Sequence, residues 1–337
     1  MPTQTDGLNI LSRAYIKGVP DSFALFLGAG VNKPAGDIPV TYQTYTWPEL
    51  LEKIYNENFG LYNKSFDQMC AEHEDDWPGL AEALVGTLNP EIVVEQIDEI
   101  IYQNIPRGDK DSRLSKKMLD QAPTLHAAIC FSSQIKERRT KSWTFKRNPR
   151  VGAVITTNYD FFFGAGWTRY QAFKKQWKVH TPFSKKRPPD HGVIYYLHGY
   201  VPYDLESREE LVLTTTSYEK YYSPGQFALK KLEEAIRRYS LIFLGISFQD
   251  QLVCNLLREA KTGHKPRHYA FVKAQEAELM NELGICPVVF EDYADIAGML
   301  EDVYCSTLSQ STLDNFALSK PQEYWSRLKK GPRQVNI

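Results

Sequence analysis

Four short polar motifs, each at the end of an apolar run, constrain the fold of this chain most. The motifs are GAGVN at 28–32, TTNYD at 156–160, LHG at 197–199 and GISFQD at 245–250. The runs are 23–27, 151–155, 193–197 and 241–244. Such runs are typical of buried parallel strands. Since ligands bind beyond the carboxyl ends of parallel strands, we expect the motifs to meet at one edge of one sheet.

The order of elements indicates an α/β fold, with a Rossmann-like, mostly parallel sheet and a helical insertion after the first strand. Besides the four runs above, we expect strands at 211–213, 268–272 and 286–290. Helices are expected within the first 20 residues and near 225–238, 250–262, 274–283 and 293–308.

From about residue 47 to residue 139 the pattern is helical, without a convincing strand. Thr46 and Glu49 fit a capping box, and Asn89 precedes another helix start. The tail carries Tyr324 and Trp325 and is either a partly ordered terminus or a docking segment for another subunit. The expected division is an α/β domain of 1–46 and 140–308, a helical insertion at 47–139, and a tail at 309–337.

Charge and cysteine content exclude several classes of protein. With 40 Lys and Arg against 41 Asp and Glu, net charge supports neither a nucleic-acid partner nor a membrane partner. The five cysteines form no C-x-x-C pair, so we expect no metal site and no disulfide framework. There is no apolar run of about 20 residues and no signal peptide, so we expect a cytoplasmic protein. The basic stretches at 134–150 and 174–187 are either solvated loops or contacts with an acidic surface or nucleic acid.

Each motif alone has an ordinary structural explanation beside a functional one. Gly28 and Gly30 could bring free N–H groups close to a phosphate or simply make a tight turn, and Lys33 replaces the third glycine of a dinucleotide fingerprint. The polar side chains at 156–160 could hold ribose hydroxyls and a water, or form Asx turns. His198 could be catalytic or structural. Ser247 and Asp250 could bind ligand, or serve as a helix N-cap and a first-turn carboxylate.

Together and in this order, the four motifs resemble those of the sirtuin superfamily. The resemblance is greatest to prokaryotic sirtuin-like proteins whose NAD hydrolysis serves antiphage defence, and it extends from Phe23 to about Asp292. It implies that NAD is the substrate. By this resemblance Asn158 and Asp160 would hold the nicotinamide ribose and the attacking water, and His198 would be the general base. The residues implied in NAD binding are Gly28, Ala29, Gly30, Val31, Asn32, Thr156, Thr157, Gly245, Ser247 and Asp250.

The chain also departs from the deacetylating sirtuins. It lacks their two C-x-x-C zinc pairs, and Asn32 stands where their first motif usually has a serine. The segment 37–41 lacks the Phe and Arg of their Pro-Asp-Phe-Arg stretch. These differences favour water as the acceptor, and therefore hydrolysis of NAD to nicotinamide and ADP-ribose. The alternatives are an NAD-dependent protein deacylase or ADP-ribosyltransferase, and a nucleotide-binding assembly subunit with little turnover.

The resemblance to defence effectors also implies partners. An unrestrained NAD hydrolase would kill its host, so activity must be held down until it is needed. We expect a homo-oligomer joined in trans by a protein partner, such as a ring-forming ATPase of the HerA type.

Overall fold

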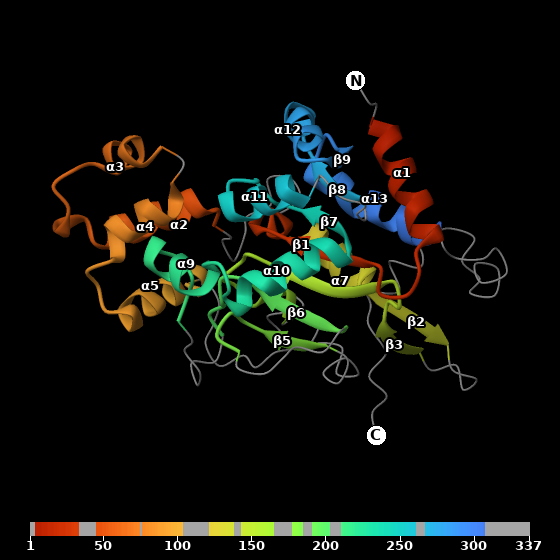
Figure 1. The fold of residues 1–337 in the computed structure, drawn as a ribbon, viewed down its shortest axis with the longest axis horizontal. Coiled ribbons are helices and arrows are strands. Elements are labelled where there is room, and N and C mark those ends of the chain that lie inside the picture. Colours follow the sequence, from red (N-terminus) through yellow and green to blue (C-terminus); the bar gives the residue numbers. More distant parts are fainter. Residues whose placement is uncertain are drawn as a thin grey trace.

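A computed structural model describes residues 4–33, 45–74, 76–103, 121–137, 143–164, 177–184, 191–202, 210–260 and 267–306. Its centre is a seven-stranded sheet in the order β5-β6-β4-β1-β7-β8-β9, with every neighbouring pair parallel (Figure 1). The predicted α/β class with a Rossmann-like, mostly parallel sheet is confirmed. The strands are β1 (Phe23–Leu27), β4 (Val151–Thr156), β5 (Lys178–His180), β6 (Val193–Tyr196), β7 (Ser240–Leu244), β8 (His268–Val272) and β9 (Ile285–Val289).

Strand β1 is central and buried over its whole length. Because side chains alternate along a strand, Leu25 and Leu27 enter one core cluster while Ala24 and Phe26 enter another. Each face of the sheet is therefore covered, as a parallel sheet requires.

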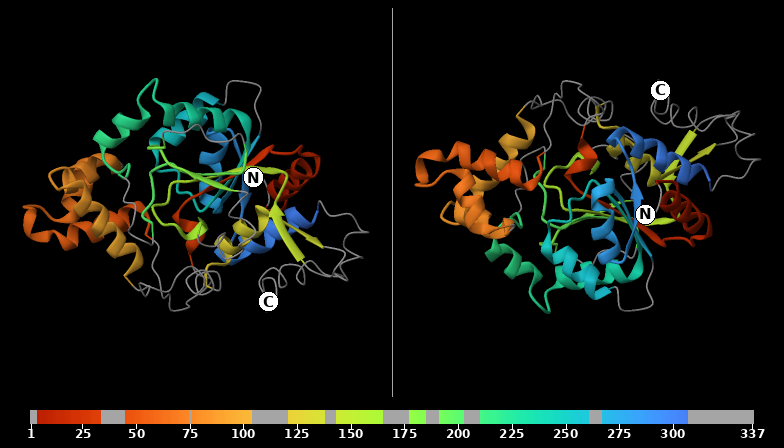
Figure 2. Two further views of the ribbon diagram at one scale, coloured as in Figure 1. Left: turned by 90° about the horizontal axis from the view of Figure 1, so that it is seen from below. Right: turned by 90° about the horizontal axis from the view of Figure 1, so that it is seen from above.

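Two sets of helices cover these faces. The first set packs with Leu25 and contains α1 (Gln4–Lys17), α7 (Pro123–Phe131) and α13 (Tyr293–Cys305). The second packs with Phe26 and contains α10 (Phe227–Arg238), α11 (Gln251–Ala260) and α12 (Ala277–Glu282). Figure 2 shows the green and cyan helices α10 and α11 on the opposite side of the sheet from the yellow α7 and the blue α13.

Four helices after β1 form a group at one end of the molecule, drawn in orange in Figure 1. They are α2 (Trp47–Glu57), α3 (Phe66–His73), α4 (Trp77–Val85) and α5 (Pro90–Tyr102). The capping box of Thr46 and Glu49 and the N-cap Asn89 are both present as predicted. Helix α4 packs against α9 (Thr215–Tyr222), and Thr216 N–H donates to Glu82 across this contact.

Some predicted elements were wrong. Residues 211–213 are buried but form no strand, because the N–H of Val212 bonds the carbonyl of His198 and not a neighbouring ladder. An antiparallel pair, β2 (Ser133–Glu137) and β3 (Trp143–Arg147), begins inside the segment expected to be helical only. Helix α13 ends at Cys305, before the expected residue 308.

Other elements were not predicted at all: α9, the edge strand β5, and the packing of α7 against α13. The tail at 309–337 lies outside the described residues, as do parts of both basic stretches. Within the described ranges, no helix has the length and apolar character needed to cross a membrane.

Candidate active site

A pocket of about 200 Å³ lies at the carboxyl edge of the sheet, where all four motifs meet. Its lining includes ten of the thirteen residues singled out from the sequence: Gly28, Ala29, Gly30, Thr157, Asn158, Asp160, His198, Gly245, Ser247 and Asp250. Strands β4 and β6 lie on one side of β1, and strands β7 and β8 lie on the other. The pocket therefore runs across the end of β1. This edge is where an open α/β sheet binds its ligands.

The other three predicted residues lie behind the pocket wall. Asn32 is buried, and its Nδ2 donates to Asp160 Oδ2 at 3.0 Å. Thr156 Oγ1 accepts from the N–H of Asn158 at 3.1 Å. Val31 packs in the core. Asn32 and Thr156 therefore support the two residues that follow β4, and do not line the pocket themselves.

The glycines of the first motif allow two loops to pack closely. A Cβ on Gly28 would lie 2.5 Å from the Gly245 carbonyl oxygen, and one on Gly245, whose φ is +64°, would lie 2.3 Å from the Val31 nitrogen. The N–H of Gly28 donates to Leu244, and the N–H of Gly30 donates to Gly245. Of the two explanations left open for this motif, the structure favours tight packing of the loops, because the end of β7 and the loop after it already accept hydrogen bonds from both N–H groups.

His198 is the centre of a buried hydrogen-bonded group. Its Nδ1 lies 3.1 Å from the Thr157 carbonyl oxygen, and its Nε2 lies 2.8 Å from the Tyr218 hydroxyl. Tyr218 donates to Asp250 Oδ2 at 3.1 Å, and the same oxygen is 3.3 Å from His198 Nε2. Both ring nitrogens of His198 therefore have partners.

Asp250 serves this group and the adjacent helix at once. Its Oδ1 accepts from the N–H of Val253, so Asp250 itself caps α11, and not Ser247, whose hydroxyl bonds the Gln249 side chain. Burial would raise the pKa of its carboxyl, but the hydrogen bond and charge of His198 hold that pKa below its ordinary value. Asp250 is therefore ionised at neutral pH.

Aromatic rings surround His198 on several sides. The rings of Trp47 and Tyr159 each lie 5.8 Å from its ring, and that of Tyr218 lies 5.5 Å away. Trp47 is the first residue of α2, so the inserted helices supply part of this site. Sequence motifs could not identify Trp47 or Tyr218, because neither follows a strand.

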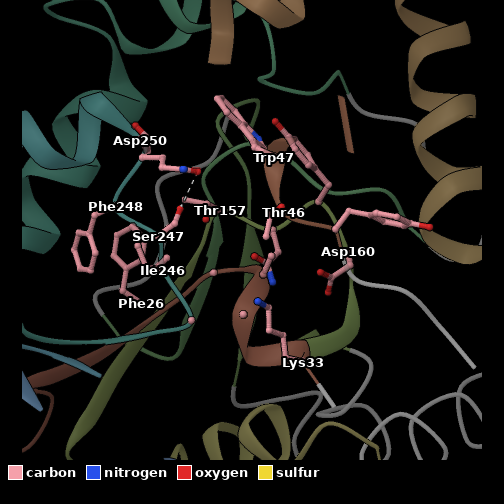
Figure 3. A pocket seen from close by; sticks show the side chains of 18 of the residues that line it. Phe26, Lys33, Thr46, Trp47, Thr157, Asp160, Ile246, Ser247, Phe248 and Asp250 are labelled. Atoms are coloured by element: carbon pink, nitrogen blue, oxygen red, sulfur yellow. Dashed lines mark hydrogen bonds between the residues drawn. The ribbon is translucent and has the colours of Figure 1, made fainter. Parts of the chain in front are cut away.

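Asp160 faces the same pocket from the opposite side to Asp250 (Figure 3). Its Oδ1 accepts from the N–H of Phe162 at 2.9 Å, and its Oδ2 accepts from Asn32. Only 8% of the residue is exposed, and burial raises the pKa of its carboxyl to about 6. A carboxyl with a pKa near neutrality in a pocket is a candidate for proton transfer.

The far end of the pocket is formed by the loops after β7 and β8 and by the start of α13. Lys33 lies there with its ammonium 5.1 Å from the centre of the Tyr293 ring. Phe248 holds a φ of +55°, which is uncommon for a bulky residue and occurs in functional loops. The lining residues at this end that sequence analysis missed are Lys33, Ile246, Phe248, Gln249, Phe271, Glu276, Phe290 and Tyr293.

No group of three or more His, Cys, Asp or Glu side chains in the described part of the chain is placed to hold a metal ion. The pocket offers four side chains for chemistry: the buried carboxyl of Asp160, the half-buried carboxyl of Asp250, the imidazole of His198 and the amide of Asn158.

Comparison with known proteins finds one matching family model and one relative. Residues 152–288 match the family model described as a SIR2-like domain. Over 260 residues the chain is 24% identical to the protein named NAD(+) hydrolase ThsA from Bacillus cereus (strain MSX-D12), an alignment that covers 76% of this chain and 44% of that relative. The chain thus spans less than half the length of the relative. Residues 152–288, which run from β4 into β9, are thus similar to a SIR2-like domain.

Proposed function

We propose that this chain hydrolyses NAD to nicotinamide and ADP-ribose in the pocket at the carboxyl edge of the sheet. The observation that carries the proposal is the meeting of Asn158, Asp160 and His198 with the glycine loop in one pocket. The SIR2-like match and the name of the relative point to the same substrate.

The two sides of the pocket suit the two halves of NAD. The loops after β4 and β6 provide the amide and carboxyl groups that would hold the nicotinamide ribose. Strand β8 provides the ring of Phe271, the residue after β9 is Phe290, and α13 begins with Tyr293; these three rings would contact the adenine. Glu276 lines this second side and would accept hydrogen bonds from the adenosine ribose.

Cleavage of the nicotinamide–ribose bond needs little covalent catalysis by the protein. Nicotinamide is a good leaving group, so binding NAD close to the oxocarbenium-like transition state and placing a nucleophile opposite it supply most of the catalysis. We propose Asn158 and Asp160 as the residues that hold the ribose and that nucleophile.

Water is the proposed nucleophile. Two features of acyl-lysine deacylases are missing from this chain. It has no C-x-x-C pair, and at the position of their serine it has Asn32, whose side chain donates a hydrogen bond to Asp160 behind the pocket wall. A deacylase or an ADP-ribosyltransferase would use the same pocket with a different acceptor, and a nucleotide-binding subunit would bind without turnover.

The biological setting is a further part of the proposal. We propose a cytoplasmic effector of antiphage defence that works as a homo-oligomer with a protein partner in trans. The support is the resemblance of the four motifs to those of defence proteins.

The experiment is to incubate the purified chain with NAD, alone and with lysates of phage-infected cells, and to separate the products by chromatography. Equal amounts of nicotinamide and ADP-ribose are expected. A parallel reaction with an acetyl-lysine peptide distinguishes the alternatives: O-acetyl-ADP-ribose would establish a deacylase, and NAD binding without product would establish a binding subunit.

A further inference from the structure

The pocket holds more negative than positive charge at neutral pH before any substrate enters it. Three carboxyl groups line it, those of Asp160, Asp250 and Glu276. Among the described residues of its lining, Lys33 is the only lysine or arginine. NAD would bring a pyrophosphate, each phosphate of which carries a negative charge. Because like charges repel and a phosphate leaves water when it binds, the pyrophosphate needs a cation beside it.

The backbone of the loop after β1 is poorly placed to meet this need. The N–H groups of Gly28 and Gly30 already donate to the end of β7 and to the loop after it. The short helix that follows, η1 (Ala29–Asn32), has four residues, so it adds little dipole. A phosphate at this edge of the sheet therefore depends on a side chain.

Lys33 stands where the two halves of NAD would join. It is the residue after η1, at the end of the central strand β1. Asn158 and His198 follow strands on one side of β1, and the rings of Phe290 and Tyr293 lie beyond strands on the other side. A dinucleotide that spans both sides places its pyrophosphate across the end of β1.

The ammonium of Lys33 is accessible to a ligand. The residue is exposed, and Figure 3 shows its side chain extending from the loop into the pocket. The ammonium lies 5.1 Å from the centre of the Tyr293 ring, and no carboxylate within the described ranges forms an ion pair with it. A contact with a ring face uses no ordinary acceptor, so the ammonium protons can still donate to phosphate oxygens.

Lys273 contacts the same ring but is differently placed. Its ammonium lies 5.5 Å from the centre of the Tyr293 ring and 4.9 Å from that of the Phe290 ring. It donates to the carbonyl of Glu291, and it does not line the pocket. Lys273 is therefore a matched control for Lys33: a lysine on the same aromatic ring, outside the space where NAD would lie.

We propose that Lys33 binds the pyrophosphate of NAD and so positions the dinucleotide across the end of β1. The inference rests on the proposed hydrolysis of NAD in this pocket. The ammonium would donate to phosphate oxygens and offset their charge, while the Tyr293 ring would hold the lysine in place. The lysine at the third glycine position of the dinucleotide fingerprint then supplies a charge in place of backbone contacts. The pyrophosphate keeps its charge throughout the reaction, so this contact contributes to substrate binding and not to the chemical step.

The test uses calorimetry with two ligands that the proposed reaction does not consume, ADP-ribose and 2′-phospho-ADP-ribose. The full chain is compared with Lys33→Met, Lys33→Arg and Lys273→Met. Lys33→Met keeps the length of the side chain without its charge and should weaken ADP-ribose binding about 10- to 100-fold. Lys33→Arg keeps the charge and should bind nearly as tightly as wild type, and Lys273→Met should match wild type. In nicotinamide release, Lys33→Met should raise the KM for NAD by a similar factor and leave kcat nearly unchanged.

Three results would overturn the assignment. Equal ADP-ribose affinity of Lys33→Met and wild type would show that the charge is not used. An equal loss in Lys33→Met and Lys33→Arg, with normal unfolding curves, would indicate a role in packing and not in charge. A loss confined to 2′-phospho-ADP-ribose would place the lysine at the adenosine ribose and not at the pyrophosphate.

Failure of the proposed function gives a different result. A wild-type chain that binds ADP-ribose but releases no nicotinamide from NAD, alone or with infected-cell lysate, refutes the hydrolysis, while calorimetry of Lys33→Met still decides where the pyrophosphate is held. A folded wild-type chain that binds neither NAD nor ADP-ribose refutes both.

Discussion

Replacing Asp160 by asparagine should change how the stability of the protein depends on pH. In the folded chain, burial raises the pKa of this carboxyl from 3.8 to about 6. In the unfolded chain the carboxyl ionises near its ordinary value. Between these two values the folded protein therefore binds a proton that the unfolded chain has lost.

The direction and size of the effect follow from proton linkage. Where the folded state binds more protons, the free energy of unfolding falls as pH rises, so this contribution is present below pH 3.8 and lost by about pH 6. The pKa difference corresponds to about 3 kcal/mol, of which about 2 kcal/mol falls between pH 4.5 and pH 7.5. Asparagine does not titrate. The free energy of unfolding of Asp160→Asn minus that of wild type should therefore be more positive by about 2 kcal/mol at pH 7.5 than at pH 4.5.

Urea unfolding followed by tryptophan fluorescence at the two pH values measures this difference. Any loss from the mismatched hydrogen bonds of the amide to Asn32 and Phe162 is the same at both values, so it cancels. Ser247→Ala, which removes a polar group of the same pocket that bonds Gln249, is the matched control and should show no such pH-dependent change. If Asp160→Asn and wild type differ by the same amount at both pH values, the carboxyl is not buried as described, and Asp160 is no longer a candidate for proton transfer.

Three further changes have expected outcomes. Asn158→Ala and His198→Ala should each remove nearly all nicotinamide release, at least about 10²-fold, without unfolding the protein; near-normal turnover of both folded variants would contradict their place in the site. Gly245→Ala should lower the free energy of unfolding by about 1–3 kcal/mol, because a φ of +64° is strained for alanine and the added Cβ would meet the Val31 nitrogen. Gly298→Ala is the control and should not lower it, because the space at that position is open. Equal stability of the two variants in thermal unfolding would refute the tight loop packing. Elemental analysis of the purified chain should find no bound zinc, since the five cysteines form no chelating pair, and one tightly held zinc per chain would revive the deacylase alternative.

The sheet and the pocket were predictable because strands carry their signal in a few consecutive residues. The runs before Gly28, Asn158, His198 and Gly245 are apolar, end abruptly, and lie in the sheet as expected. The same signal failed at 211–213. That segment is as buried as a strand, but the N–H of Val212 donates to the His198 carbonyl and the Val212 carbonyl accepts from the Tyr159 hydroxyl. An apolar run in the sequence does not show which groups its backbone will bond.

The partners of the catalytic candidates were not predictable for a related reason. Tyr218 lies in the middle of α9, and Trp47 begins α2, so neither follows a strand. Their role depends on which helices pack over the sheet edge. Only the packing of α4 against α9 and of Trp47 on His198 reveals it.

The inserted helices also have a consequence for how such a site can diversify. Trp47 and Leu50 of α2 and Ile101 of α5 close one side of the pocket, while the polar groups stand on loops of the sheet. The chemistry and the shape of the cavity are therefore encoded in separate stretches of sequence. Exchange of the segment 47–103 between related chains can change which molecules fit while Asn158, Asp160 and His198 stay in register on their strands. In this architecture the loops of the sheet carry the polar groups, and the inserted helices help to set the shape of the space in front of them.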